Sequence, residues 1–379
     1  MEISCVTRTS AAEDQTAMMF VALELSKSRW LVAVYSPIAD KISCHGIAGG
    51  DSSALLALIG RYRRQAEEHL KRPIRVFSCY EAGYDGFWLH RLLRANGIEN
   101  HVMDPASLPV DRRARRVKTD RVDLDALLRA LMAWRRGEPQ VCRMVRVPSL
   151  EEEDRRRQTR ERARLIRERT QHINRIKGLL MTQGIRTFMP APRDWRERLA
   201  KLHTGDGRDI PRALKAEIER ECERLQLVMD MIRKVEAERD AAHDNAGQVG
   251  MLTRLSGIAA ISAHVLVNEV FYRAFANRRE VAAYCGLTSS PYNSGAMIRD
   301  QGISRAGNRR ARSTAVELAW LWLRYQPESR LSRWFHERVG QTRGRFKRIM
   351  IVALARKLMV ALWCYLATGI VPEGAAVKA

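Results

Sequence analysis

Short apolar runs alternate with longer amphipathic segments through the first third of this 379-residue chain. Apolar runs bounded by turn residues are typical of strands, and apolar residues with a period of 3.6 are typical of helices. The patterns predict strands at Met18–Glu24, Trp30–Tyr35, Lys41–His45, Ile74–Tyr80 and Ile98–Met103, and helices at Asp51–Leu70, Tyr84–Asn96 and from Asp120 onward. The resulting order, β-β-β-α-β-α-β-α, indicates an α/β domain in which helices cover a mixed sheet.

Carboxylates stand at the ends of these elements. Glu24 closes the first strand, Glu81 directly follows the Ile74–Tyr80 strand, and Asp120 and Asp123 start the last helix. Functional sites in such sheets lie at strand ends, and residues three apart share one face of a helix. We therefore expect these carboxylates to converge.

Three neighbouring aspartates compete for the same role. Asp125 lies two residues after Asp123, so it points away from the face that Asp120 and Asp123 share. Asp85 resembles a helix cap, and Asp104, which precedes a proline, resembles a turn residue. We expect all three to lie outside the site.

Basic residues crowd around the aspartate pair: Arg112, Arg113, Arg115, Arg116, Lys118 and Arg121. Carboxylate oxygens are the ligands that Mg²⁺ prefers, and two such ions held by several carboxylates catalyse phosphoryl transfer. Lysine and arginine bind phosphate. The combination predicts phosphodiester chemistry, with Mg²⁺ (two ions) as the cofactor.

The charge composition agrees with a nucleic-acid substrate, because the chain has 66 Lys and Arg against 43 Asp and Glu, for a formal net charge of +23. Such an excess is typical of nucleic-acid-binding proteins. The alternative is a generally basic protein from a GC-rich genome, but here the basic residues cluster. The seven cysteines are scattered without a C-x-x-C pair, which disfavours zinc ribbons and fits a reducing cytoplasm.

Neither end of the chain predicts a membrane anchor. Residues 1–17 are mixed polar and charged, without a secretory signal, and we expect a disordered tail or a start codon assigned too far upstream. The apolar run Leu358–Pro372 is too short for a membrane span and predicts a buried helix.

After the α/β domain, assigned to residues 18–148, the sequence shows a helical pattern of apolar residues and is rich in arginine. Two periodic segments flank a polar break at Gln183–Ile210, which predicts a helical hairpin or coiled-coil arm over residues 149–246. Its arginines form either a solvated helix face or a nucleic-acid contact, and their excess over acids on the first helix favours contact.

The last region, residues 247–372, is predicted to be helical with a glycine-rich centre. The segment Leu255–Leu266 resembles a helix-hairpin-helix element, in which the turn at Gly257 would present backbone N–H groups to a DNA phosphate, although Ala259 replaces the usual second glycine. Beyond it lie two blocks, one around Gly286, Ser294 and Gly295 and one containing Ser304, Arg305, Gly307, Asn308, Arg309 and Arg312.

Taken in order, the strand-end glutamates, the Lys118-Thr-Asp-x-x-Asp123 motif and the two glycine-containing blocks resemble the IS110 family of bacterial insertion-sequence transposases. The similarity covers about residues 18 to 330. The family's first acid is usually aspartate, whereas Glu24 here is longer by one methylene and can still bind Mg²⁺.

The resemblance implies an RNase H-like (RuvC-like) "DEDD" domain, in which Glu24, Glu81, Asp120 and Asp123 hold Mg²⁺. It also implies a serine in the C-terminal transposase domain that attacks the DNA phosphate, and the matching position is Ser294 beside Gly295. The sequence Asn-Ser-Gly is also typical of an ordinary turn. Ser289 and Ser290 are nearby alternatives for the attacking serine. Arg305, Asn308, Arg309 and Arg312 would flank the phosphate.

The family further implies an element-encoded guide RNA, and a synapse of two DNAs implies a homodimer or tetramer joined through the arm. Two other functions are also compatible with the sequence. A RuvC-like endonuclease would hydrolyse DNA with metal alone, and a nucleic-acid-binding protein with a decayed site would lack activity.

Overall fold

The computed structural model describes residues 17–39, 41–108, 120–190, 193–241, 247–294 and 297–378. The side chains of residues 120 and 292–300 are outside that description, and so is the predicted N-terminal tail up to residue 16. The chain divides into two compact units, residues 1–147 and residues 148–379, and each is considered by itself.

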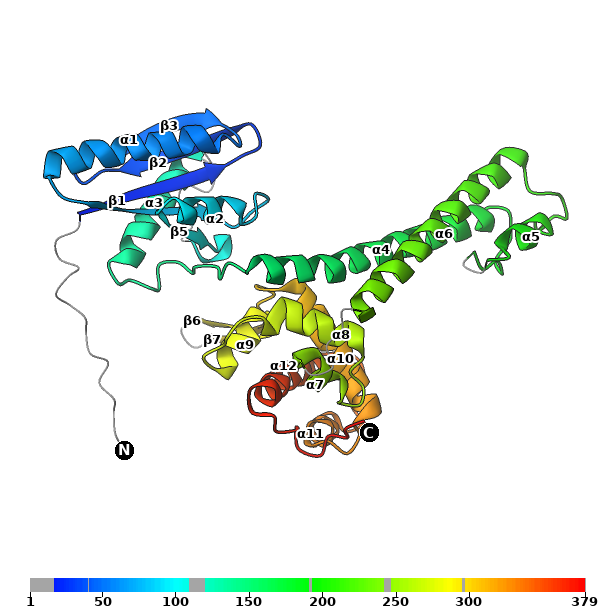
Figure 1. Cartoon of the computed structure of the whole chain (residues 1–379). Coiled ribbons are helices and arrows are strands. Elements are labelled where there is room, and N and C mark those ends of the chain that lie inside the picture. Colours follow the sequence, from blue (N-terminus) through cyan, green and yellow to red (C-terminus); the bar gives the residue numbers. More distant parts are fainter. Residues whose placement is uncertain are drawn as a thin grey trace. The chain divides into compact units, whose positions relative to one another are not determined.

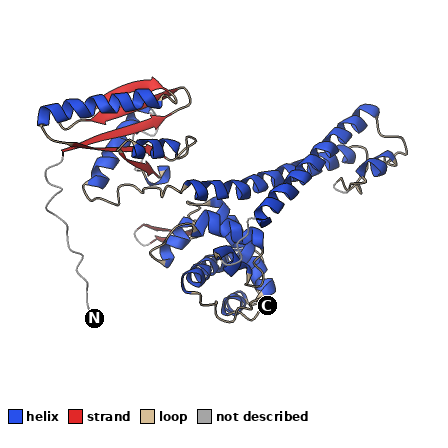
Figure 2. Ribbon diagram, in the orientation of Figure 1, coloured by secondary structure: helices blue, strands red, loops and turns tan. Residues whose placement is uncertain are grey.

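The first unit is a five-stranded mixed sheet with the strand order β3-β2-β1-β4-β5 (Figure 1; Figure 2). Its strands are β1 (Ala17–Leu25), β2 (Arg29–Tyr35), β3 (Ser43–Ala48), β4 (Ile74–Glu81) and β5 (Glu99–Met103). The first three strands pair antiparallel, whereas β4 runs parallel to both β1 and β5. The predicted mixed sheet is confirmed, with strand ends shifted by up to three residues.

Helices cover both faces of this sheet because its strands alternate side chains between two cores. Leu23 and Tyr80 pack with α1 (Ser52–Leu70) and α2 (Trp88–Ala95), whereas Ala22 and Cys79 pack with α3 (Asp120–Arg135). A short 3-10 helix, η2 (Pro105–Ser107), follows β5.

The start of α2 was predicted too early. The sequence suggests Tyr84, but the helix begins at Trp88, because residues 84–87 form a turn in which Gly86 has a φ of +64°. The residue that caps α2 is Phe87, so the reading of Asp85 as a helix cap is wrong.

The second unit begins with two long antiparallel helices, α4 (Leu150–Met181) and α6 (Arg212–Ala241), which lie side by side (Figure 1). A capping box starts α4, since the Ser149 hydroxyl accepts from the Glu152 N–H and the Glu152 side chain accepts from the Ser149 N–H. The predicted polar break contains an additional helix, α5 (Trp195–Ala200), whose Trp195 is buried between the long helices and their connection. Six residues are too few to show a helical period.

The remaining elements enclose one apolar core. They are α7 (Gln248–Thr253), α8 (Ala260–Leu266), the π-helical turn η3 (Val267–Phe271), α9 (Arg278–Tyr284), β6 (Ser289–Ser294), β7 (Met297–Ile303), α10 (Arg309–Tyr325), α11 (Arg330–Val339) and α12 (Arg345–Thr368). The prediction of a helical region with a glycine-rich centre did not include the hairpin of β6 and β7, whose polar residues show no apolar alternation.

Helix α12 contains residues 358–368 of the apolar run that was predicted to be a buried helix. The prediction is wrong for the last four residues of that run, because the helix ends at Thr368 and Ile370 beyond it is 73% exposed. By length and composition alone α12 is the one helix in the described ranges that could cross a membrane. Its residues Leu354, Leu358 and Leu362, however, are completely buried in the core of the second unit. The structure thus accounts for its hydropathy as core packing.

Candidate functional site

Glu24 and Glu81 lie at the ends of two adjacent parallel strands. The register pairs Leu23 with Tyr80, so the next residues, the two glutamates, are level with each other. Strand alternation puts both on the α3 face of the sheet. Burial raises the pKa of the Cys79 thiol on that face, and electrostatic interactions with Cys142 and with Glu81 raise it further. The structure therefore brings this predicted pair together, and both residues are half-buried.

The other two predicted carboxylates belong to the first turn of α3, which packs on β1, β2 and β4. Asp123 is half-buried, just before the fully buried Leu124. The position of the Asp120 side chain is outside the described residues. Asp125, which was expected to point elsewhere, accepts a hydrogen bond of 2.7 Å from Nε of Arg129 on the exposed side of α3.

Asp104 is the turn residue that the sequence predicts. Its carboxylate accepts a 3.0 Å hydrogen bond from the N–H of Ala106, and it caps η2.

The donor chemistry of the strand-end acids fits Mg²⁺, because carboxylate oxygens are its preferred protein ligands. Among the side chains described, no group of three or more His, Cys, Asp or Glu is close enough to hold a metal ion. The described part of the candidate metal centre is thus a pair, Glu24 and Glu81, on the sheet face that α3 covers, with Asp123 in the first turn of that helix.

Ser294 is the last residue of β6 and pairs with Met297 of β7. It therefore stands at the tip of the hairpin, and Gly295, the other predicted residue there, is outside the described residues. The same hairpin contains Ser289 and Ser290, the alternative serines, at the opposite end of β6.

The two glycine-containing blocks meet where the hairpin joins the helices. Gly307 has a φ of +90°, and a Cβ there would lie 2.4 Å from the carbonyl oxygen of Tyr284. That same oxygen accepts a 2.7 Å hydrogen bond from the N–H of Asn308. Close backbone packing at the start of α10 therefore requires glycine at this position.

Gly307→Ala is expected to destabilise the protein by about 2 kcal/mol or more, from left-handed strain plus overpacking. The measurement is urea unfolding followed by circular dichroism. Gly302→Ala is the matched control, because Gly302 has a φ of +86° but a Cβ there would meet no described atom within 4 Å. Equal losses of stability in the two variants would contradict the packing role of Gly307.

A wide groove of about 2150 Å³ runs beside the hairpin and along α12. Residues of β6 and β7 line it, including Ser289 and Gln301. Its described lining contains one carboxylate, Glu373, against eight cations: Arg278, Arg279, Arg305, Arg330, Arg345, Arg348, Arg356 and Lys357. Apolar side chains such as Ile349 and Val352 lie between them. A polyanion with exposed apolar faces, such as a nucleic acid, matches this lining.

Of the residues predicted to flank a phosphate, only Arg305 lines this groove. The guanidinium of Arg312 donates a 2.9 Å hydrogen bond to the carbonyl of Arg305 and so supports that turn. Arg309 lines a different cavity. Asn308 is the N-cap of α10, where its side-chain oxygen accepts from the N–H groups of Arg310 and Ala311.

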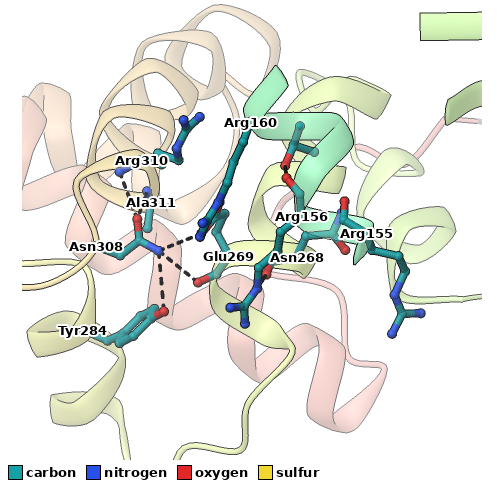
Figure 3. Close-up of polar contacts among 10 residues, drawn as sticks. Arg155, Arg156, Arg160, Asn268, Glu269, Tyr284, Asn308, Arg310 and Ala311 are labelled. Carbon is teal, nitrogen blue, oxygen red and sulfur yellow. Dashed lines mark hydrogen bonds and ion pairs between the residues drawn. The ribbon is translucent and has the colours of Figure 1, made fainter. Parts of the chain in front are cut away.

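Figure 3 shows that Asn308 also belongs to a network around a buried carboxylate, Glu269. Arg160 of α4 donates two hydrogen bonds to Glu269, at 2.8 and 3.1 Å, and the Asn308 amide donates another at 3.1 Å. Beside them, Arg156 donates to the carbonyl of Asn268 and stacks over the ring of Tyr272. The network joins the arm helix α4 to η3 and to the start of α10.

Glu269 and its partners are not among the functional residues predicted from the sequence. A lone acid inside the apolar run Val265–Phe271 is a signal, because a buried carboxylate needs a positive partner. The sequence does not reveal that the partner is Arg160, 109 positions earlier.

Burial alone would raise the pKa of Glu269, but the hydrogen bonds and charge of Arg160, together with Asn308 and Arg156, lower it below its ordinary value of 4.5. Because the folded pKa is depressed, this carboxylate stabilises the fold above about pH 4.5 and loses that contribution as the pH falls through the folded pKa.

Glu269→Gln is expected to lower the free energy of unfolding by about 1–3 kcal/mol at pH 7 and to flatten the pH dependence of stability in acid. Unfolding midpoints of both proteins between pH 3 and 7 check this, and parallel pH curves would contradict it.

The predicted helix-hairpin-helix turn is a close turn between α7 and α8, with Gly257 at a φ of +87°. The N–H of Ser256 donates to the carbonyl of Ala376, and Lys378 donates through Nζ to the carbonyls of Thr253 and Ile258. A Cβ on Gly257 would lie 3.1 Å from the Cβ of Tyr325 in α10. The turn thus packs against the C-terminal segment and α10.

The predicted basic segment falls largely outside the described residues. Arg112, Arg113, Arg115, Arg116 and Lys118 belong to residues 109–119, and Arg121 is exposed on α3.

Comparison with known protein families gives two matches. Residues 22–183 match a family described as "Transposase", the DEDD domain of IS110 elements, and residues 250–332 match the "Transposase IS116/IS110/IS902 family". The first match includes Glu24, Glu81, Asp120 and Asp123, and the second includes Ser294.

Known proteins with similar sequences are named as transposases. "Putative transposase y4rJ" of Sinorhizobium fredii is 50% identical over 375 residues, which is 95% of this chain and 94% of that protein. "Transposase for insertion sequence element IS1111A" of Coxiella burnetii is 26% identical over 66% of each chain. "Transposase for insertion sequence element IS1328" of Yersinia enterocolitica is 27% identical over 56% of this chain and 62% of that protein.

Proposed function

Because this chain belongs to the IS116/IS110/IS902 family of transposases, we propose that it cleaves and rejoins DNA strands to move an insertion sequence, using a metal-binding carboxylate centre, a serine nucleophile and an element-encoded guide RNA. The transposase family and the DNA partner follow from the matched domains. The chemistry and the guide are the proposed part.

The observation that carries the proposal is the level pair Glu24 and Glu81 on the α3 face of the sheet. A sheet of order 3-2-1-4-5, antiparallel in its first three strands and then parallel, supports an RNase H-like fold for the first unit. We infer that these glutamates, with Asp120 and Asp123 of α3, hold Mg²⁺. When bound, Mg²⁺ neutralises charge that develops on the phosphate oxygens.

In the second unit, the hydroxyl of Ser294 is the proposed nucleophile. Its oxygen forms a bond to the DNA phosphorus, the bond from phosphorus to one deoxyribose oxygen breaks, and the released sugar hydroxyl takes up the proton. The energy of the phosphodiester remains in the serine ester, so a second sugar hydroxyl can reverse the reaction with a new partner strand. The cationic groove that the hairpin borders supports this role, since DNA bound there would pass β6.

The proposed organisation has a RuvC-like domain over residues 18–148, an arm over 149–246 and a transposase domain over 247–372. The arm is the proposed contact between copies in a dimer or tetramer. Exposed apolar residues on α6, Leu227 and Met231, support that role, because a solvent-facing pair one turn apart suits helix–helix association.

A recombination assay tests the function. Purified protein is incubated with plasmids carrying the element flanks, in the presence of Mg²⁺ and RNA transcribed from the non-coding DNA beside the gene, and new junctions are amplified and sequenced. We expect junctions only when both RNA and Mg²⁺ are present. Junctions formed equally well without RNA would remove the guide from the proposal, and the absence of junctions under every condition would leave a nucleic-acid-binding protein.

A further inference from the structure

A second cavity, separate from the cationic groove, lies among four helices of the second unit: α4, α6, α8 and α10. Its volume is about 410 Å³. Five arginines line it, and no carboxylate is among its described lining residues: Arg162 and Arg167 from α4, Arg239 from α6, and Arg309 and Arg310 from α10. We call this space, with the five arginines that line it, the arginine cavity.

The cations of the arginine cavity are only partly neutralised by the protein. Arg162 donates at 2.6 Å to Glu236, and Arg239 donates through Nε and Nη2 to Asp240. For Arg167, Arg309 and Arg310 the described residues include no ion-pair partner. Excess positive charge therefore remains where the helices meet.

Arg239 gives an independent indication of a missing partner. Its side chain is 9% exposed, and its Nη1 is buried without a hydrogen-bond partner among the described residues. An unsatisfied buried donor costs roughly 1–3 kcal/mol, so this Nη1 calls for an acceptor, such as a bound anion or a water. Arg239, whose Nη1 is this unpaired donor, lines the cavity.

Other features of the lining define the chemistry of that acceptor. The start of α10 supplies Arg309 and Arg310, and a helix N-terminus attracts anions. The hydroxyls of Ser313 and Thr314 are donors one turn further on. Ile261 and Val265 of α8 add an apolar wall. Guanidinium groups bind phosphate through paired hydrogen bonds, hydroxyls add single ones, and an apolar wall suits a sugar.

We propose that the arginine cavity is a binding site for a backbone phosphate of a nucleic acid, held where the arm meets the transposase domain. The proposal rests on the proposed function only in taking nucleic acid as the partner. DNA and RNA share the phosphodiester that the cavity recognises, and binding experiments with each distinguish the source.

The test compares two double variants of the full chain. Arg167→Gln with Arg310→Gln removes two cavity arginines, one on α4 and one on α10. The control, Arg164→Gln with Arg220→Gln, removes one arginine from α4 and one from α6, neither of which lines the cavity. Labelled duplex DNA from the element ends and labelled RNA from the element flanks are titrated at several salt concentrations.

For at least one of the two nucleic acids, we expect the cavity variant to bind about 10- to 100-fold more weakly than the wild type, with a salt slope smaller by about 1–2. The control variant should lose less than threefold. Weakening of RNA binding alone assigns the site to RNA, and weakening of DNA binding alone assigns it to DNA. If both variants bind both probes equally, the cavity is not a phosphate site.

Ser313→Asp provides a second variant that does not remove an arginine. A carboxylate at this exposed position in the N-terminal part of α10 would itself occupy the cavity, so the melting temperature should rise while nucleic-acid affinity falls. Unchanged affinity would overturn the proposal even if an arginine variant failed to fold. A wild-type protein that bound neither probe would instead contradict the proposed function.

Discussion

Ser294→Ala is expected to abolish covalent attachment of the protein to DNA and to reduce strand joining by about 10³-fold or more, because the alanine side chain has no oxygen to form the phosphoserine ester. The reaction is run with end-labelled DNA, RNA, Mg²⁺ and purified protein, and is stopped in detergent. Labelled DNA that migrates with the protein on a denaturing gel measures the ester directly. Sequenced junctions measure joining in the same sample.

Ser290→Ala is the matched control for this variant. It makes the same substitution on the same strand, at the end of β6 away from the hairpin tip. We expect it to retain the covalent product and at least half of the joining activity. If Ser294→Ala joined DNA as well as the wild type does, the serine mechanism would be wrong, and a metal-only RuvC-like endonuclease would be the better description of any remaining cleavage.

Glu81→Gln is expected to lower both cleavage and joining by about 10²- to 10⁴-fold while leaving DNA affinity unchanged or slightly higher. The amide keeps the shape of the side chain but removes the charge that holds Mg²⁺, and it also removes a negative charge that repels phosphate. The rate is measured as a function of Mg²⁺ concentration, with DNA affinity determined in parallel. A variant that needs more Mg²⁺ for half-maximal activity would link Glu81 to the metal directly.

Asp125→Asn is the control for Glu81→Gln. It also converts a carboxylate to an amide, but Asp125 pairs with Arg129 on the exposed side of α3. Its activity should stay within twofold of the wild type. Full activity of Glu81→Gln, with unchanged Mg²⁺ dependence, would exclude this carboxylate from the metal centre.

The sequence predicts the sheet of the first unit well because its central strands β1, β2 and β4 are largely buried and the strands are separated by clear turns. Residues such as Val21 and Phe77 belong to continuous apolar runs that allow few other structures. The strand-end positions of Glu24 and Glu81 could be read in the same way. The strand register that places the two glutamates level with each other could not be predicted from the sequence, because it depends on pairing across the intervening β2, β3 and α1.

The second unit was less predictable because its important features arise from contacts between distant residues. The hairpin of β6 and β7 has polar strands such as Ser289–Ser294, and its ends are fixed by the close packing of Gly286 and Gly307 rather than by apolar alternation. In the sequence, Arg160 cannot be distinguished from the other arginines of the arm. Only the folded structure shows that it donates hydrogen bonds to Glu269. Local sequence signals contain no information on such partners.

The bonds from Arg160 to Glu269 also have a mechanical consequence. From that anchor α4 continues as one unbroken helix to Met181, a length of about 30 Å at 1.5 Å per residue. A stiff rod fixed at one end acts as a lever, so a pull on its far end by bound RNA or by a second copy produces a torque at the anchor. The Asn308 cap shares that anchor and directly follows the β6–β7 hairpin and its connecting turn. Load on the arm would therefore reach the segment that carries Ser294.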